Sequence, residues 1–569
     1  YSITVDGEAD GAGTTTSGFA VDIDGALGSN VNLIITTQAT TDIDLAATSG
    51  NVRDLTINHA SCVAQMKSDV SLSGNLTITA GQLTTGTHGY GYSNLTVAGY
   101  THVGTGSSAA DTSTLTLNTS THSFGTGKTD AEALWIKRGG TLVGGSGNWT
   151  AGSVVADNHA HCKFTLTSGT ITVNGHSADS TRPILLGGTS TGTAAHGGGT
   201  IDITYASAYN LHNDSTTSLN NLTLTGNTTA TMSGNITMAG TLTVTASTTL
   251  DTDSSNNRSL TVTGDAIIDG TLTGNASAIS LGSLAVGGTY SATSGTTTIT
   301  SERSNGRATD IVGTYTHNGG ILKIQTPADT DLRWPSSSNC NHLIIDHASC
   351  IARPTGDNKP PIAGNLLINQ GKFSLLDSDG SATHQCTVTG DVIIGDGSGS
   401  ANTAIFEGRD DSVTFGSLTI DSDGKYDATS GTTTITSESG AGYAANVDGT
   451  FTHNNGTLTI TTPASTFMSP ITPYNLIINH SSANVRYTGS SSTTMTIAND
   501  LTITAGIFDP DDGDENLTVT GDVSVTGTLG ASNVTSAMSF GSLTINSGGT
   551  YIATSGTTTL KSETSGGST

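Results

Sequence analysis

The amino-acid sequence predicts an all-β chain that folds as a right-handed parallel β-helix, or β-solenoid. Short alternating runs of Leu, Thr, Ile and Val recur with a period of about 20 residues, inside a longer block with a period of about 130 residues. Gly, Ser and Thr dominate, and charged residues make up only 11% of the chain. Alternation of this kind is typical of half-buried strands, and the scarcity of Lys and Glu argues against long helices. Right-handed connections dominate between parallel strands, which gives the expected handedness.

The short period begins after residue 53. It consists of triplets in which the outer two residues share one face of a strand. They are Leu55-Thr-Ile, Leu76-Thr-Ile, Leu95-Thr-Val, Leu115-Thr-Leu and Leu134-Trp-Ile, which follow one another at nearly constant spacing. We interpret each triplet as part of one coil, with each Leu stacked on the Leu of the preceding coil. This interpretation gives roughly 28 coils and a rod on the order of 130 Å long.

The long repeat divides the chain into superrepeats. Its copies share Gly-Ser-Leu segments at Gly282, Gly416 and Gly541, and Thr-Gly-Asp segments that end at Asp265, Asp391 and Asp522. We expect an N-terminal cap or lead-in (1–53), a divergent solenoid segment (54–211), two superrepeats (212–341 and 342–474) and a partial third (475–569). The third copy ends where the other two continue, so we expect that the protein extends further or that its end is disordered.

A tandem array of β-sandwiches is the alternative architecture. It predicts one hydrophobic core for each block of about 130 residues, and no similarity within a block. The internal period of about 20 residues favours the solenoid.

Composition excludes several classes of partner. The formal net charge is −27, and the basic residues are too dispersed to form the clusters that bind nucleic acid or anionic membranes. No apolar run reaches the roughly 20 residues of a membrane-spanning helix. The five cysteines are too few and too scattered for a disulfide framework. Cys340 and Cys350 flank one predicted strand and could pair only if the chain folds back there.

Recurring carboxylates are the strongest candidates for a metal site. Pairs of Asp precede the Thr-Gly-Asp segment of each superrepeat, and the third pair lies in a longer acidic run. Several carboxylates on one turn suit Ca²⁺, which takes six to eight oxygen ligands. The alternative is that these Asp side chains accept hydrogen bonds from their own turns. The candidate ligands are Asp251, Asp253, Asp377, Asp379, Asp509, Asp511, Asp512 and Asp514.

A second recurring motif contains histidine and cysteine. It occurs as Asn58-His-Ala-Ser-Cys62, Asn158-His-Ala-His-Cys162 and Asp346-His-Ala-Ser-Cys350, with a diverged copy at Asn479-His-Ser-Ser-Ala483. Zinc binds these residue types, but one His and one Cys per copy do not supply four ligands. We therefore expect a hydrogen-bonded polar turn with a small buried Cys.

Catalytic motifs are sparse. Glycoside hydrolysis needs two carboxylates about 5–9.5 Å apart, and the one acidic cluster outside the turns is Asp410-Asp411 with Glu407 nearby. We find no nucleophile elbow, phosphate-binding loop or dinucleotide motif, so we assign no catalytic residue and expect a protein that is not an enzyme. Of the three tryptophans, Trp135 occupies a triplet, where we expect it to be packed rather than to face a sugar.

The repeats resemble those of phage tail-fibre and other virion surface proteins, and also those of secreted adhesins related to filamentous haemagglutinin. The shared motifs are Asn-Leu-Thr-Ile, Leu-Thr-Val-Thr-Gly-Asp, Gly-Ser-Leu-Thr-Ile and Thr-His-Asn-Asn-Gly-Thr-Leu, which cover most of residues 54–569. The resemblance implies a β-helical surface fibre or adhesin and transfers no catalytic residue.

We accordingly expect a homo-oligomeric or fibre-forming attachment protein. It would lie on a virion or outside a cell and contact a host receptor such as a glycan, with Ca²⁺ as the one candidate cofactor. A secreted bacterial or archaeal adhesin or fibril subunit, and a polysaccharide depolymerase, are the alternatives.

Overall fold

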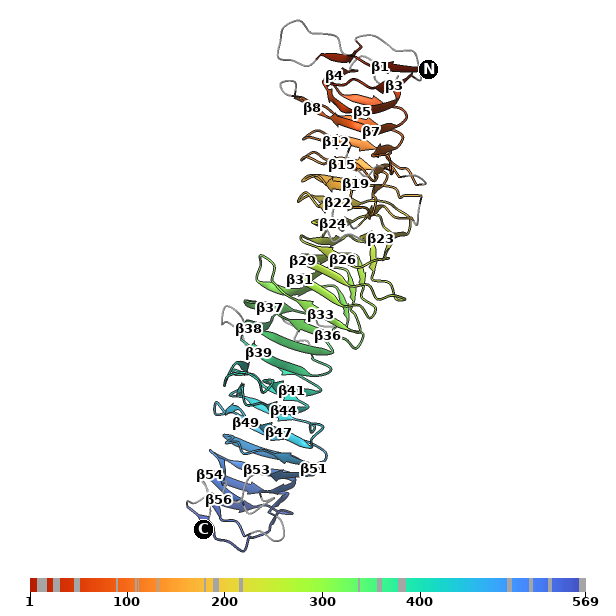
Figure 1. The fold of residues 1–569 in the computed structure, drawn as a ribbon. Helices are drawn as coiled ribbons and strands as arrows, with labels where there is room; N and C mark the ends of the chain where they lie inside the picture. Colours follow the sequence, from red (N-terminus) through yellow and green to blue (C-terminus); the bar gives the residue numbers. More distant parts are fainter. Residues whose placement is uncertain are drawn as a thin grey trace. The chain divides into compact units, whose positions relative to one another are not determined.

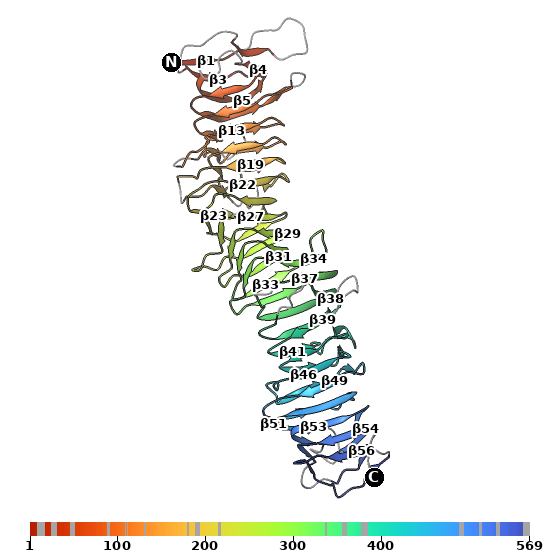
Figure 2. The same cartoon turned by 180° about the vertical axis from the view of Figure 1, so that it is seen from behind.

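The structure of the protein is a computed structural model, shown from two opposite sides in Figures 1 and 2. The described residues group into two compact units. Unit 1 is Tyr1–Leu281 with Gly287–Ser291, and unit 2 is Gly282–Val286 with Ala292–Thr569. The structure describes residues 1–7, 18–23, 31–45, 52–87, 91–107, 110, 112–129, 132–178, 181–187, 194–213, 218–335, 338–355, 361–376, 385–488, 494–510, 515–530 and 535–561.

Stacked parallel strands build both units. Strands make up 56% of the chain and form a right-handed β-helix of about 22 turns, which confirms the predicted fold class and excludes the tandem β-sandwiches. Within the described ranges no residue is helical, and hence no helix is long and apolar enough to cross a membrane. One short antiparallel pair, of β8 (Gly86–Thr87) and β9 (Gly91–Tyr92), lies outside the parallel stacks.

Unit 1 contains three stacks of strands, in each of which a strand pairs with its counterparts in the coils before and after it. Stack one consists of β1 (Ser2–Val5), β3 (Val31–Ile35), β5 (Val52–Met66), β7 (Leu76–Thr84), β11 (Thr101–Val103), β14 (Leu134–Ile136), β17 (Val154–Ala156), β20 (Ile184–Leu186), β23 (Tyr209–Asn213), β25 (Thr229–Met232), β28 (Thr249–Asp251), β30 (Thr271–Thr273) and β32 (Thr289–Ser291). Stack two consists of β2 (Phe19–Asp22), β4 (Thr40–Asp44), the second halves of β5 and β7, β12 (Ser113–Thr116), β15 (Gly140–Val143), β18 (Lys163–Thr165) and β21 (Ala194–Ala195). Stack three consists of β6 (Val70–Leu72), β10 (Leu95–Val97), β13 (His122–Phe124), β16 (Trp149–Ala151), β19 (Thr170–Val173), β22 (Thr200–Ile203), β24 (Asn221–Leu224), β27 (Leu242–Val244) and the second half of β29 (Leu260–Ile268), whose first half pairs with β26 (Ile236–Met238).

Unit 2 is built in the same way. Its first stack consists of the end of β31 (Ile279–Val286), β34 (Arg307–Ile311), β37 (Asp329–Arg333), the second halves of β38 (His342–Thr355) and β39 (Leu366–Ser374), β42 (Ala404–Glu407), β45 (Gly424–Asp427) and β48 (Thr450–Thr452). Its second stack consists of β33 (Thr296–Ile299), β36 (Ile321–Ile324), the first halves of β38 and β39, β41 (Asp391–Ile394), β44 (Ser417–Ile420), β47 (Tyr443–Val447), β50 (Ser465–Met468), the second halves of β51 (Asn475–Tyr487) and β53 (Leu501–Asp509), β55 (Thr528–Leu529) and β57 (Thr550–Tyr551). Its third stack consists of β40 (Cys386–Thr387), β43 (Val413–Phe415), β46 (Thr432–Ile435), β49 (Thr457–Ile460), the first halves of β51 and β53, and the second halves of β54 (Asn516–Val525) and β56 (Met538–Ile545). The first half of β54 pairs with β52 (Thr494–Ile497), and the first half of β56 pairs with β58 (Thr558–Leu560). Unit 2 also contains the short strand β35 (Thr314–Thr316).

Coil length varies along the chain, which explains why the turns are fewer than the roughly 28 expected. Leu55 pairs with Leu76, the next triplet along the chain, but Leu76 pairs with Thr101 rather than with the following triplet. The expectation that each Leu stacks on the previous one is wrong for Leu95, which belongs to stack three, and for Leu115, which belongs to stack two. It is also wrong for Leu134, which pairs with Thr101 rather than with Leu115. Each coil carries up to three similar strands, so triplets from different faces follow one another at similar spacing.

The interior of each unit is filled by stacked apolar side chains. In unit 2, Phe406 lies with its ring centroid 5.6 Å from Phe373 and 5.3 Å from both Phe415 and Tyr426. All four rings are at most 2% exposed. In such a core, packing of one coil on the next buries each ring on both sides, which makes aromatic side chains large contributors to stability.

A polar ladder connects successive coils and accounts for the Asn-Leu-Thr and Thr-Gly-Asp motifs. The side-chain oxygen of Asn75 accepts a hydrogen bond from the backbone N–H of Tyr100 in the next coil, at 3.0 Å. A Cβ atom at Gly99 would lie 2.1 Å from that same oxygen, so only glycine fits at this position, directly before Tyr100. Equivalent bonds join Asp54 to Asn75 N, Asn94 to Thr121 N, Asn148 to Thr170 N, Asn221 to Thr241 N, Asn365 to Asp391 N, Asp500 to Asp522 N and Asn516 to Ala537 N.

The repeated Gly-Ser-Leu and Tyr-x-Ala-Thr-Ser-Gly-Thr-Thr segments also make structural bonds. The Ser417 hydroxyl donates to Asp391 of the preceding coil at 2.7 Å, and Ser542 donates to Asp522 at 2.6 Å. Within one coil, the Tyr426 hydroxyl lies 2.7 Å from the hydroxyl of Thr433. These segments therefore stabilise the coil.

Candidate functional site

The first pair of predicted calcium ligands forms a hydrogen-bonded turn. One carboxylate oxygen of Asp251 accepts hydrogen bonds from the backbone N–H of Asp253, at 2.9 Å, and from the side chain of Asn275, at 2.7 Å. Asp253 has a φ of +68° and accepts from Ser255 N at 2.9 Å and Asn256 Nδ2 at 2.6 Å. These bonds, led by that of Asn256, lower the pKa of Asp253. The arrangement matches the alternative of carboxylates that serve their own turn.

The other predicted calcium ligands are only partly described. Asp509 ends β53 and is 7% exposed. Asp377, Asp379, Asp511, Asp512 and Asp514 lie outside the described residues. Among the residues that are described, no group of three or more His, Cys, Asp or Glu is arranged to hold a metal ion. Calcium binding by the third acidic run stays a prediction.

Three of the four copies of the His-containing motif form a bulged corner within a long strand, whereas the copy at 158–162 forms a turn between β17 and β18. The Nδ1 atom of His59 accepts a hydrogen bond from Ser61 N at 3.2 Å, and Cys62 points into the core with 1% exposure. The next coil places Gly81 against this corner, where a Cβ would lie 2.4 Å from the His59 carbonyl oxygen. The same corner recurs with His347, Cys350 and Gly371, and with His480, Ala483 and Gly506. The motif is a structural turn, as the sequence predicted.

All five cysteines are buried free thiols, so Cys340 and Cys350 do not pair. Burial raises the pKa of Cys62 to about 11 and those of Cys162, Cys340, Cys350 and Cys386 to about 12. Thiolates are the reactive species. We therefore expect no reaction of the folded protein with a disulfide-exchange reagent at pH 8 within an hour, and five equivalents after denaturation. Rapid reaction of even one equivalent in the folded state would contradict this burial.

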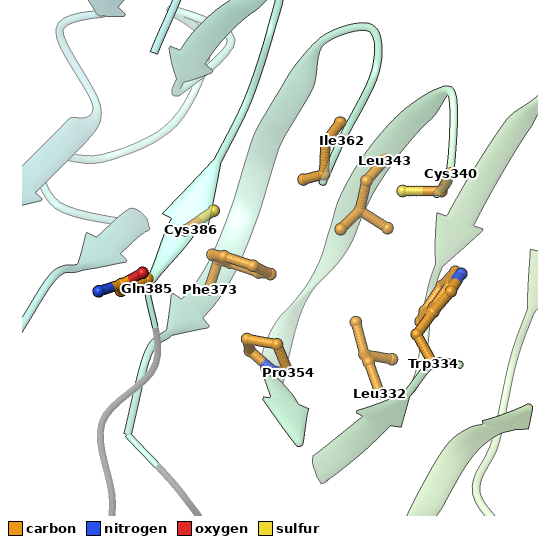
Figure 3. Close-up of a pocket in the computed structure, with 9 residues that line it drawn as sticks. All are labelled: Leu332, Trp334, Cys340, Leu343, Pro354, Ile362, Phe373, Gln385 and Cys386. Atoms are coloured by element: carbon orange, nitrogen blue, oxygen red, sulfur yellow. The ribbon is translucent and has the colours of Figure 1, made fainter. Parts of the chain in front are cut away.

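Cys340 and Cys386 line a small apolar cavity in unit 2 (Figure 3). Its other lining residues are Leu332, Trp334, Leu343, Pro354, Ile362, Phe373 and Gln385, and the Gln385 side chain points away from the cavity. The cavity volume of ≈ 20 Å³ is close to the space needed by one water molecule. Such a cavity holds no organic substrate and is a gap between stacked coils.

Glu407, in the acidic cluster considered for hydrolysis, is paired with basic neighbours. Glu407 lies 2.5 Å from Arg409 and 3.7 Å from Lys372, and it accepts a hydrogen bond from the Ser374 hydroxyl at 2.7 Å. Burial alone would raise the pKa of Glu407. The hydrogen bond from Ser374 and the charges of Lys372 and Arg409 outweigh this effect, so the pKa lies below its usual value. A general acid in glycoside hydrolysis needs a raised pKa instead. Asp410 accepts a hydrogen bond from the Ser430 hydroxyl at 3.1 Å.

One of the three tryptophans points to the outer face of its strand and is packed only in part. Trp149 and Trp334 are 1% and 4% exposed, whereas Trp135 is half-buried on the outward side of β14. Its indole N–H donates to Asp157 at 2.6 Å, and the Lys137 ammonium lies 4.2 Å from the ring centroid. Trp135 therefore presents part of its ring to solvent while its edge is fixed by a carboxylate.

Trp135 belongs to an outer aromatic cluster, defined as Tyr100, His102, Trp135 and Lys137. The His102 ring stacks on Tyr100, with centroids 4.3 Å apart and planes 20° apart, and meets Trp135 edge to face at 5.3 Å. Burial, with help from the Lys137 charge, lowers the pKa of His102 to about 4. The neutral imidazole accepts from the Lys137 ammonium, since its Nδ1 lies 3.1 Å from Nζ. The cluster thus combines aromatic faces with a fixed ammonium donor.

A polar groove crosses stack three in unit 1. It has a volume of ≈ 650 Å³ and is lined by Asp69, Val70, Ser71, Asn94, Thr96, Thr121, His122 and Ser123. Asn94 donates to Asp69 at 2.9 Å and accepts from Thr121 N at 3.0 Å, so the ladder itself forms the floor. The volume is within the range of ligand-binding clefts. Its lining offers mostly hydroxyls and amides, together with the Asp69 carboxylate, which is bonded to Asn94, and the buried ring of His122.

We expect His122, whose buried ring lines this groove, to make the stability of unit 1 depend on pH. Its Nδ1 accepts from Leu95 N at 3.2 Å, and burial lowers its pKa to about 4, although Asp69 opposes the shift. An unfolded His takes up a proton near pH 6.5, so stability is full above that pH and falls as the pH drops toward 4. We expect a loss of up to about 3 kcal/mol in unfolding free energy from this residue.

Guanidinium unfolding at pH 7.5, 5.5 and 4 measures this loss. In the His122→Asn variant, which keeps an acceptor for Leu95 N but does not titrate, the dependence should be flatter. An identical dependence in both proteins would rule out His122 as its source.

Sequence reasoning missed Tyr100, His102, Lys137 and Asp157. A signal was available, because the middle residue of each triplet points outward. That position is Thr in most triplets but His in Thr101-His-Val and Trp in Leu134-Trp-Ile.

Comparison with known proteins adds no identification. No protein-family model, no curated protein and no solved structure matches the chain.

Proposed function

We propose that the protein is a structural attachment element of a surface fibre, of the phage fibre or spike type, that contacts glycans on a host cell. The observation that carries this proposal is the continuity of the coils. In both units an Asx side chain of one coil accepts from the backbone of the next, over a core of stacked apolar rows. Such a stack resists bending within a unit and presents a long outer surface, which suits a spacer that bears contacts.

A secreted bacterial or archaeal adhesin or fibril subunit is the second form of this proposal, because it uses the same solenoid. The repeat motifs resemble both classes. Mass spectrometry of purified virions and of secreted cell-surface fractions from the source organism would distinguish the two. In either setting we propose assembly into a homo-oligomer or fibre, which light scattering of the purified chain would measure.

A polysaccharide depolymerase on a β-helix is less well supported. The lowered pKa of Glu407 and its ion pairs with Arg409 and Lys372 suit a structural carboxylate better than a general acid. We accordingly propose a function without catalysis.

Binding to cells tests the proposal. Fluorescently labelled protein is incubated with a panel of bacterial cells, before and after mild periodate oxidation of their glycans. We expect binding to a subset of strains that is lost after oxidation. Binding to no strain, or binding that survives oxidation, would contradict attachment to a glycan. Release of oligosaccharides during incubation would show instead that the protein is a depolymerase.

A further inference from the structure

The outer aromatic cluster (Tyr100, His102, Trp135 and Lys137) begins where a row of outward threonines in stack one ends. In stack one, the outward position is Thr56 in one coil and Thr77 in the next. In the two coils that follow, the same position is occupied by His102 and then by Trp135. Thr is a small polar residue that suits a solvated strand face, whereas three rings in neighbouring positions expose apolar surface to water. A function of this surface would explain why aromatic side chains replace Thr here.

The cluster is held in place before any ligand arrives. The backbone of Tyr100 is fixed on both sides, because its N–H donates to Asn75 Oδ1 at 3.0 Å and its carbonyl accepts from Leu76 N at 3.0 Å. One face of its ring is covered by His102, yet the residue remains 37% exposed. Binding on the other face would therefore cost little side-chain entropy.

The polar groups around the rings are also fixed. Asp157 holds the Trp135 indole N–H with one oxygen, at 2.6 Å, and accepts from Arg138 N with the other, at 2.9 Å. Lys137 keeps donor capacity beyond its contact with His102, because an ammonium has three N–H groups. An open ring face beside a fixed hydrogen-bond donor is an arrangement that can bind the apolar face and a hydroxyl of a pyranose.

Charge selects among glycans. The chain has a net charge of −27. Burial lowers the pKa of Lys137, while the carboxylates of Asp157 and Glu132 act on it in the opposite direction. The one ammonium in the cluster is thus already close to two carboxylates, and a polyanionic glycan would meet repulsion from the rest of the surface.

We propose that the outer aromatic cluster is a docking platform for neutral glycans, with a pyranose ring stacked on Tyr100 and hydroxyls bound by Lys137. This inference rests on the proposed attachment function and names the site and the ligand class for it. A single platform binds weakly, and several copies of the chain in a fibre would bind with avidity.

Titration with defined hexasaccharides tests the platform. The neutral probes are mannohexaose, maltohexaose and cellohexaose, and the acidic probe is hexagalacturonate. We expect at least one neutral probe to bind and to change the tryptophan fluorescence, and the acidic probe to bind no better. Trp149 and Trp334 are buried, so the Trp135→Phe variant should lose the fluorescence change.

Tyr100→Ala should weaken binding by calorimetry about tenfold, while Tyr100→Phe, which keeps the ring, should bind within about threefold of the wild type. Tyr92→Ala is the matched control, because Tyr92 is 62% exposed but lies outside the cluster, and it should bind as the wild type does. Circular dichroism of each variant checks that the solenoid is intact.

Several outcomes would overturn the platform. These are wild-type affinity in Tyr100→Ala, equal weakening in Tyr92→Ala, preference for hexagalacturonate, or no binding of any neutral probe. The attachment function is judged separately, by periodate-sensitive binding of the wild type to cells. If Tyr100→Ala retains that binding, glycan attachment stands and the platform is wrong. If the wild type lacks it, the attachment function fails.

Discussion

Replacing Gly371 by alanine is expected to destabilise unit 2 by roughly 2–5 kcal/mol. Gly371 has a φ of +86°, and a Cβ there would lie 2.4 Å from the His347 carbonyl oxygen and 2.8 Å from that of Cys350. Backbone atoms cannot rotate away, so the bulged corner of β38 has to move. The strain of a left-handed residue adds to this overlap.

Gly319→Ala separates the two contributions. Gly319 has a φ of +78°, but no atom lies within 4 Å of the position its Cβ would take. We expect this control to lose about 1–2 kcal/mol, from backbone strain alone. Guanidinium unfolding measures both variants, and hydrogen exchange of residues 347–350 locates the damage. Equal losses in the two variants would show that the corner relaxes around the new methyl group.

Phe406→Ala is expected to cost about 3–5 kcal/mol, the range measured for large buried rings. Phe406 is 0% exposed and contacts the rings of Phe373, Phe415 and Tyr426. Its removal leaves a cavity between coils whose strands are held in register by backbone hydrogen bonds, so the walls cannot close. Thermal and guanidinium unfolding of the variant measure the loss.

Val312→Ala provides the control for loss of apolar volume. Val312 is 56% exposed in the same unit, and its truncation should change the unfolding free energy by less than about 0.5 kcal/mol. A loss below about 1 kcal/mol in Phe406→Ala would mean that the core around this ring is loosely packed.

The fold was predictable because the strand period of a solenoid is also a period of its sequence. Alternation of Leu and Ile with Thr identifies the strands, and repetition of the blocks identifies stacking. The number of coils was not predictable from the triplets, since Leu76, Leu95 and Leu115 lie in three different stacks of strands. The spacing between two triplets of one coil is similar to the spacing between matching triplets of successive coils. Only the pairing of the strands distinguishes the two cases.

The surface was harder to predict than the fold. Recurring Asp and His residues drew attention in the sequence, yet Asp251, Asp253 and His59 hydrogen-bond their own turns. Residues that recur from coil to coil are those that every coil needs in order to fold. The outer aromatic cluster, with Tyr100, His102 and Trp135, lies outside the repeated motifs, so a search for repeats passes over it.

The polar ladder gives the coils a direction. In each bond, the acceptor belongs to the earlier coil and the backbone donor to the later one, as in Asp54 with Asn75 and Asn75 with Tyr100. A finished coil is therefore a template with its acceptor already in position for the chain that follows. Folding of such a chain can proceed vectorially, from the first residues synthesised to the last. A block of whole coils can likewise be duplicated without redesign, because its two ends are complementary, and this explains how the long repeats could arise.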